Sequence, residues 1–185
     1  ILDIGSSQRL YCWSPNSEYI IYNDLDQFKL RKVAVRSGAV TTLCDISASA
    51  GAAWRSDDTI VFSQLQGLYV VPARGGTPKE FLVPNASQGE SAYEYPYFLP
   101  DGRTLCFTVT FQDGSSNLMV QRGETRRTLL PDRSDSRILF PSYISSGHLL
   151  YQQIHERESQ LWAVPFDLES LTGGGEPFLI AGSAG

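Results

Sequence analysis

The stretch YCWSPNSEYIIY, residues 11–22, contains an aromatic residue, a polar turn and a β-rich run in direct succession. Trp13 precedes the turn, which consists of serine, proline and asparagine at positions 14–17. Residues of these types close tight turns, and the tyrosines and isoleucines that follow at 19–22 are typical of strands. The stretch therefore predicts a β-hairpin, and its recurrence elsewhere in the chain decides the fold.

The same succession of features occurs three more times, as WRSDDTIVF from residue 54, FLPDGRTLCF from residue 98 and YISSGHLLY from residue 143. The anchor aromatics, Trp13, Trp54, Phe98 and Tyr143, are separated by 41, 44 and 45 residues. Each copy continues with a third apolar run, a turn and a final short run, which gives four short strands per repeat. This pattern is typical of β-propeller blades. We predict an all-β protein with four four-stranded antiparallel blades, near residues 10–46, 51–84, 93–131 and 138–182.

Two other architectures fit the pattern less well. A helical repeat would require apolar residues at helical spacing, and a β-sandwich would show hairpins without a longer superperiod. In a propeller, the anchor aromatic ends the innermost strand of each blade, where it can fill the wedge between neighbouring blades. We therefore interpret the anchors and the turn residues after them as structural.

The composition excludes several classes of function. The chain has 185 residues, is 42% hydrophobic and carries a formal net charge of −5, so it lacks the basic surface that nucleic-acid binding requires. No apolar segment reaches the roughly 20 residues that a membrane-spanning helix needs, and the first residues show no targeting signal. Cys12, Cys44 and Cys106 lie in apolar runs without metal-ligand spacing, and we expect them to be buried free thiols.

The turns and their order resemble a known repeat family. WSPN, FLPDG and the double-glycine turns look like the TolB-type, WD-like propeller repeat, whose hallmark is a W-S-P-D-G turn. Over nearly the whole chain, the order from WSPNSEYIIY through GLYVVPARGGTPKEF to LWAVPFDLESLTGGGEPFLIAG is similar to the propeller attached to bacterial serine/threonine protein kinases. That resemblance implies an extracytoplasmic location and further blades on both sides of the chain. The kinase motifs themselves are absent from the sequence.

No motif in the chain indicates catalysis. HERE at 155–158 lacks the second histidine of a zinc-protease helix, and QGESAYEYP at 88–96 is not the G-x-S-x-G turn that exposes a nucleophile. We therefore expect neither a catalytic site nor a metal or other cofactor. The leading hypothesis is a non-catalytic binding or sensing segment of a larger bacterial signalling protein. The alternative, from a different class, is the propeller subdomain of a hydrolase or peptidase.

Acidic residues outnumber basic ones in the loops that one face of a propeller would present. Such a face would attract cationic ligands or basic peptides, although a merely solvated surface explains the same charge. Tyr93, Tyr95 and Tyr97 alternate along the first strand of the third blade, and alternation would point all three to one side. Exposed tyrosines beside carboxylates suit peptide recognition, although at least one of the three is expected to pack between blades instead. The predicted binding residues are Asp24, Asp26, Glu90, Tyr93, Glu94, Tyr95, Asp113 and Glu156.

The predicted partners are a peptide, a protein or a small cationic ligand, bound at this acidic mouth of the propeller channel. A second copy of the chain is a further expected partner, because unpaired strands at the edges of an open arc of blades are templates for association. Either the four blades close as a ring, or two arcs pair with two-fold symmetry. The family resemblance, with its missing flanking blades, favours pairing.

Overall fold

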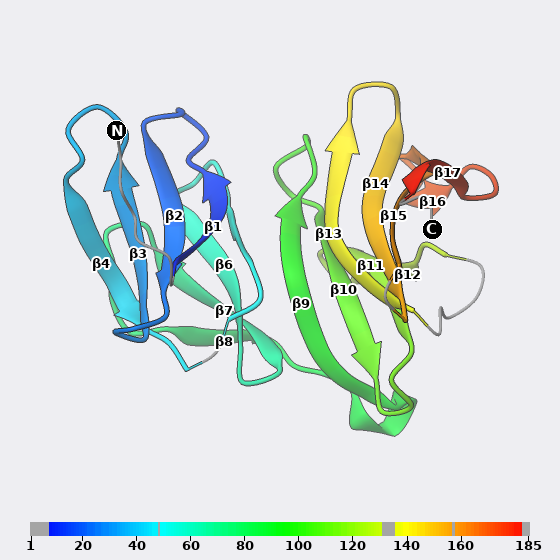
Figure 1. The fold of residues 1–185 in the computed structure, drawn as a ribbon, viewed down its shortest axis with the longest axis horizontal. Coiled ribbons are helices and arrows are strands. Elements are labelled where there is room, and N and C mark those ends of the chain that lie inside the picture. The colour runs from blue at the N-terminus through cyan, green and yellow to red at the C-terminus, as the bar shows by residue number, and fades with distance from the viewer. Residues whose placement is uncertain (1–7, 48, 131–135, 157, 183–185) are drawn as a thin grey trace. The chain divides into compact units, whose positions relative to one another are not determined.

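The computed structural model describes residues 8–47, 49–130, 136–156 and 158–182. The regular secondary structure of these residues consists of antiparallel strands and one 3-10 helix (η1, Ala86–Gln88), and it includes no α-helix. The strands form four separate sheets of the kind that the repeat predicts (Figure 1). The predicted all-β fold class is confirmed.

The first two sheets are regular four-stranded meanders, in which each strand pairs with the next along the chain. Trp13 pairs with Ile20 across the opening turn, so the stretch that begins the repeat is the predicted hairpin. The first sheet contains β1 (Gln8–Trp13), β2 (Tyr19–Asp24), β3 (Lys29–Ala34) and β4 (Val40–Asp45). The second sheet contains β5 (Ala52–Trp54), β6 (Thr59–Gln64), β7 (Gly67–Pro72) and β8 (Lys79–Leu82).

The third sheet repeats this meander, and the fourth adds a short strand to it. The third sheet contains β9 (Glu90–Phe98), β10 (Leu105–Phe111), β11 (Ser116–Arg122) and β12 (Thr125–Thr128). The fourth contains β13 (Arg137–Ile144), β14 (His148–His155), β15 (Glu158–Asp167), β16 (Thr172–Gly173) and β17 (Phe178–Gly182). Both β16 and β17 pair with β15, because the long glycine-containing connection after β15 pairs briefly before it reaches the edge of the sheet.

The chain divides into two compact units, residues 1–83 and 84–185, and each unit contains two of the sheets. In the first unit, apolar side chains of the first and second sheets form one core, to which Ile21 and Ile60 belong. In the second unit, a corresponding core that includes Leu149 joins the third and fourth sheets. The apolar triplet after each turn therefore supplies core residues, as a strand that is buried between two layers requires.

The anchor aromatics differ in their burial. Trp54 is 9% exposed and lies against Tyr19 of the first sheet, with 6.1 Å between the ring centres, so it fills the wedge between two sheets as predicted. Phe98 and Tyr143 are partly buried. The prediction is wrong for Trp13, which is 55% exposed. Trp13 lies outside the core that joins the first and second sheets, and the described residues of its unit leave the indole open to solvent.

β-Bulges interrupt the first strand of three sheets. The pairing register shifts at Tyr11 in β1, at Tyr95 and Pro96 in β9, and at Phe140 and Pro141 in β13. Tyr95 and Phe140 each have a φ of 51°, a left-handed value that is rare for bulky residues, and a proline follows each of them. A bulge places two residues opposite one, and so it breaks the alternation of side chains along the strand.

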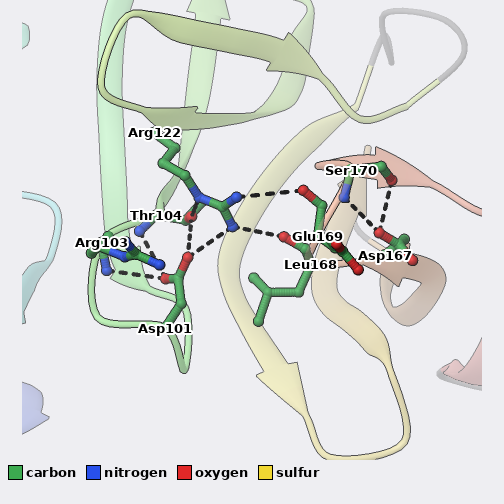
Figure 2. A network of polar contacts seen from close by, with 8 residues as sticks. All are labelled: Asp101, Arg103, Thr104, Arg122, Asp167, Leu168, Glu169 and Ser170. Atoms are coloured by element: carbon green, nitrogen blue, oxygen red, sulfur yellow. Dashed lines mark hydrogen bonds and ion pairs between the residues drawn. The ribbon is translucent and has the colours of Figure 1, made fainter.

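A polar network ties the third sheet to the fourth at the turn between β9 and β10 (Figure 2). Arg122 donates hydrogen bonds to Thr104 Oγ1 (2.8 Å), to Asp101 Oδ2 (2.8 Å) and to the carbonyl oxygen of Leu168, after β15 (2.7 Å). Burial opposes ionisation of Asp101, but hydrogen bonds from Thr104, Arg103 and Arg122 outweigh it and lower the pKa of this carboxyl group. The Pro-Asp-Gly turn of the third repeat thus joins two sheets as well as two strands.

Candidate functional site

The first unit contains a cleft of about 1170 Å³ between its two sheets. Three turns line this cleft: the turn between β1 and β2, the turn between β5 and β6, and the glycine-containing turn between β7 and β8. Lys32 of β3 and the rings of Tyr19 and Trp54 complete its wall. The cleft lies at one end of the strands. The β2–β3 turn, where the sequence predicts binding by Asp24 and Asp26, lies at the other end.

Lys32 lies over aromatic rings at the wall of the cleft. It is in the middle of β3, where it pairs with Ile21 of β2 and Thr41 of β4. Its ammonium nitrogen is 4.7 Å from the ring centre of Tyr19 and 5.8 Å from that of Trp54. Cation–π attraction of this kind positions an ammonium group without neutralising its charge. Two rings therefore hold a half-buried cation at the cleft.

Two carboxylates of the cleft have hydrogen-bond donors of their own. Asp57 accepts hydrogen bonds from Arg55, one of them from Nε at 2.9 Å. The hydrogen bonding with Arg55 lowers the pKa of Asp57 to about 2, because it stabilises the ionised form. Asp58 Oδ1 accepts a hydrogen bond of 3.2 Å from the indole nitrogen of Trp54. Both carboxylates are therefore partnered within the turn that carries them.

The cations of the cleft have no such partners. Lys32, Arg74 and Lys79 all line the cleft, and among the described residues none of them has a carboxylate oxygen within 4.0 Å. Glu18, the third carboxylate in the lining, instead accepts a hydrogen bond of 2.9 Å from the side-chain amide of Asn16. The cleft thus presents three cationic groups beside carboxylates that other donors have engaged.

This arrangement suits recognition of a polar ligand. Hydroxyl groups of Ser56, Thr59 and Thr77 line the cleft together with the cations, and no histidine or cysteine is among its described lining residues. Cations in a partly enclosed site concentrate anionic groups, and charge-assisted hydrogen bonds to them are stronger than neutral ones. Hydroxyl and carboxylate oxygens around them can bind the uncharged parts of such a ligand.

Two of the predicted binding residues, Glu90 and Tyr93, form a buried cluster in the second unit. Glu90 is 3% exposed and Tyr93 is 1% exposed. Glu90 accepts hydrogen bonds from the phenol of Tyr93 and from the backbone N–H of Asn85 (2.7 Å), and it pairs with Arg126 Nη2 at 2.7 Å. The guanidinium group of Arg126 also lies 5.0 Å from the ring centre of Tyr93. Desolvation, followed by the hydrogen bond to Glu90, raises the pKa of Tyr93 to about 12.

The prediction that Glu90 and Tyr93 are exposed to a ligand is therefore wrong. Register shifts in β9 on both sides of Tyr93 break the alternation that the sequence suggests. Tyr93 turns into the core against Phe107, with 5.0 Å between the ring centres, and Glu90 turns to the same side. Ion pairing with Arg126 and two hydrogen bonds offset the cost of burying the carboxylate.

Glu94 and Tyr95 follow along β9 and are partly buried. The carboxylate of Glu94 accepts a hydrogen bond of 3.1 Å from the hydroxyl of Thr110. The ring of Tyr95 contacts that of Phe140 edge to face, with 4.6 Å between the ring centres. Phe140 is 58% exposed, so this aromatic pair at the two bulges is accessible to solvent on the Phe140 side.

The remaining predicted residues lie at the ends of three different sheets. Asp24 is buried and forms an ion pair of 3.3 Å with Arg31, so it adds little charge to an acidic surface. Asp26, Asp113 and Glu156 are exposed in the turns that follow β2, β10 and β14. The structure therefore brings Glu90 and Tyr93 into contact, and it pairs Asp24 and Glu90 with arginines. Ligand binding by the exposed acids stays a prediction.

A serine–histidine contact lies near the start of β13. Ser136 Oγ is 3.2 Å from His155 Nδ1. The carbonyl oxygen of Ser136 accepts a hydrogen bond from Ser116 Oγ, which in turn accepts one from the N–H of Ile138. These bonds join β11 to β13, and Ser136 is buried, so its hydroxyl is not presented to a substrate in this arrangement.

The three cysteines are free thiols, as predicted. Cys44 and Cys106 are buried and Cys12 is partly buried. Desolvation raises the pKa of Cys12 to about 12 and that of Cys44 to about 11, which suppresses thiolate formation near neutral pH. Within the described parts of the chain, no group of three or more His, Cys, Asp or Glu side chains is placed to hold a metal ion. Those same parts contain no helix with the length and hydropathy needed to cross a bilayer.

Several solved structures resemble the chain. TolB from Acinetobacter baumannii has a TM-score of 0.64 at 13% sequence identity, over 83% of this chain and 39% of TolB. An auxiliary nutrient-binding protein from Bacteroides thetaiotaomicron has a TM-score of 0.69 at 12% identity, over 93% of this chain and 41% of its own. Regucalcin from Agrobacterium tumefaciens, a calcium-binding protein, has a TM-score of 0.67 at 14% identity, over 97% of this chain and 61% of its own. The chain has the β-propeller fold.

The propeller fold is what these comparisons establish. The chain spans 39% of TolB and 41% of the nutrient-binding protein, which is well under half of either. No protein-family model and no curated protein matches the sequence. The similarity to propellers of bacterial kinases therefore stays a prediction.

Proposed function

We propose that the chain is a non-catalytic, ligand-binding segment of a larger β-propeller protein, and that the cleft between its first and second sheets is the binding site. The observation that carries this proposal is Lys32, a half-buried cation held over two aromatic rings with no carboxylate partner among the described residues. Its neighbours in β3, Lys29 and Arg31, both pair with aspartates.

The cost of burial supports this interpretation. Partial burial of an ammonium group removes part of its hydration, and proteins normally compensate with a counter-ion. Tyr19 and Trp54 contact Lys32 but supply no negative charge. A ligand that supplied the missing interaction would gain binding energy from a group that is already in position, so little side-chain ordering would oppose binding.

The resemblance to kinase-attached propellers extends the proposal to the parent protein. On that basis the segment belongs to a bacterial signalling protein and lies outside the cytoplasm, where its cleft would sample a ligand. The alternative is the propeller subdomain of a hydrolase or peptidase, in which the same cleft would hold part of a substrate. Turnover assays with lactone, ester and peptide substrates would separate the two, because the binding proposal expects occupancy of the cleft without product.

Heteronuclear NMR of the tryptophan indole groups tests the proposal directly. The indole N–H of Trp54 lines the cleft and donates to Asp58, whereas that of Trp162 donates to Gln160 in the other unit and serves as an internal control. The probes are acetate, inorganic phosphate, glucose, glucuronate and a lysine dipeptide, added one at a time. We expect at least one of them to shift the Trp54 signal and to leave the Trp162 signal in place. If none of these probes moves the Trp54 signal selectively, the cleft is not the binding site.

Association of two chains through their edge strands is a separate part of the proposal. Sedimentation equilibrium over a dilution series would test it. A strictly monomeric particle of 20.5 kDa at the highest concentration would contradict pairing of two copies.

A further inference from the structure

We infer that the ligand of the cleft in the first unit is a small oxyanion, a carboxylate or phosphate carried on a hydroxylated body, and that Lys32 is its counter-ion. This inference rests on the proposed function, since it names the class of ligand for the same site. It departs from the cationic ligand that the sequence suggests for the acidic loops.

The charges of the cleft favour an anion. Its lining residues carry three positive and three negative groups, and Asp57 is neutralised by Arg55, which is not one of the lining residues. The charge that remains for a ligand is therefore positive by one. The distribution of partners points the same way: Asp58 accepts a hydrogen bond from Trp54, whereas among the described residues the ammonium group of Lys32 has no acceptor beyond the two rings. A cationic ligand would meet three cations and only two carboxylates that are not paired with an arginine.

The position of Lys32 shows where the anion would lie. Both aromatic rings approach the ammonium group, so their faces occupy one side of it and cannot accept its N–H donors as an oxyanion can. An ammonium group has three donors, and those not directed at the rings are available at the cleft. Arg74, in the turn between β7 and β8, and Lys79, the first residue of β8, also line the cleft and supply two further cations for the ligand.

The rest of the lining favours a hydroxylated body. Ser56, Thr59 and Thr77 present hydroxyl groups, and Glu18 and Asp58 retain carboxylate lone pairs that can accept from ligand hydroxyls. A purely apolar anion, such as a fatty acid, would form no hydrogen bonds with these groups apart from those of its carboxylate. A volume of about 1170 Å³ accommodates a molecule larger than the anion itself.

Titrations with matched ligands test the charge requirement on the unmodified chain. Glucuronate and glucose 6-phosphate provide the carboxylate and phosphate arms, and glucose and glucuronate methyl ester provide the uncharged counterparts. We expect at least one of the two anions to shift the Trp54 indole signal at concentrations about tenfold or more below those at which glucose or the ester does so. Added salt should weaken the binding of the anion and leave that of glucose unchanged.

Substitution of Lys32 tests the counter-ion. Lys32→Gln should weaken the binding of the anion about tenfold or more, and Lys32→Arg should retain most of it, because the guanidinium group keeps the charge. Lys29→Gln is the matched control: Lys29 lies on the same strand but pairs with Asp45 and does not line the cleft. An unchanged far-ultraviolet circular dichroism spectrum and urea midpoint confirm that each variant is folded, because Trp162 lies in the other unit and does not report on the first. If Lys32→Gln does not fold, Lys32→Arg and the ester comparison still decide.

Two results would overturn the inference. Equal affinity for glucuronate and its methyl ester would show that the anion is not what the cleft recognises, and unchanged affinity in Lys32→Gln would show that Lys32 is not the counter-ion. In either case selective shifts of the Trp54 signal would leave the proposed binding site intact. Failure of every probe to move that signal would remove the binding site together with the inference.

Discussion

Replacement of Trp54 by alanine should be far more damaging than the same change at Trp13, although both residues occupy the anchor position of the repeat. Tryptophan side chains bury about 200 Å² when they are enclosed. Trp54 is 9% exposed, so it hides about 180 Å², which corresponds to about 4.5 kcal/mol at about 25 cal/mol per Å². Loss of its hydrogen bond to Asp58 adds about 1 kcal/mol at most, and partial relaxation of the cavity offsets some of the total. We expect Trp54→Ala to cost about 4 to 5 kcal/mol.

Trp13 provides the matched comparison. It is 55% exposed, so less than half of its area is buried, and the same arithmetic gives an upper limit of about 2 kcal/mol for Trp13→Ala. Urea denaturation followed by far-ultraviolet circular dichroism would measure both free energies of unfolding. The midpoint should fall strongly for Trp54→Ala and only slightly for Trp13→Ala.

The comparison can fail in a clear way. Equal destabilisation by the two substitutions would show that Trp13 is enclosed in the protein in solution, for instance by another sheet or another copy. A loss of less than about 1 kcal/mol for Trp54→Ala would contradict the wedge role of this residue, because such a value is typical of exposed sites.

Three further predictions concern the second unit. Arg122→Met should destabilise the chain by about 1 to 3 kcal/mol. The lowered pKa of Asp101 stabilises the fold above the pKa of the unfolded carboxyl group, and this contribution is lost as pH falls through the folded pKa. Arg122→Met should reduce this acid dependence only in part, because the hydrogen bonds from Thr104 and Arg103 lower the pKa more than that from Arg122. Ultraviolet titration should show that the phenol of Tyr93 ionises only near pH 12, so the stability that the protonated phenol contributes is lost as pH rises from about 10 toward 12. Tyr93→Phe should cost about 1 to 2 kcal/mol, because buried Glu90 loses a hydrogen-bond donor. Cys106 should be inert to a thiol reagent in the native protein and should react only as fast as the chain opens, because full burial raises the pKa of its thiol; rapid modification without denaturant would contradict its place in the core.

The fold could be predicted from the sequence because each copy of the repeat consists of features that depend on residues close together in the chain. The turn after Trp13 is closed by its own side chains: Ser14 Oγ accepts from the N–H of Tyr19 at 2.9 Å and donates to Asn16 at 2.7 Å. Features of this kind depend on neighbours in the chain, and the spacing of 41 to 45 residues between the copies then defines the sheets. The exposure of Trp13 could not be predicted, because it depends on what covers the first sheet.

The candidate site depended on contacts between distant residues, and here the sequence was less informative. Alternation along β9 predicted that Tyr93 is exposed, but bulges leave no strong signal in a single sequence, apart from the proline after Tyr95. The ion pair between Glu90 and Arg126 could not be predicted either, because the two residues are 36 positions apart in the sequence. Lys32 looks like an ordinary strand residue until the ion pairs of its neighbours are known. The candidate site is identified by the cations that have no carboxylate partner, and only the folded chain shows which cations these are.

The bulges in the first strands should oppose self-assembly of the chain into fibrils. β1, β9 and β13 each lie at one edge of their sheet, where a row of free amide and carbonyl groups could template another strand. Pro96 and Pro141 remove an amide donor from two of these edges, and the bulge at each proline bends the ladder away from a straight register. The remaining such edge, β5, has only three residues. An incoming strand would thus find no long uninterrupted ladder at these four edges, so they resist open-ended stacking even when no neighbouring sheet covers them.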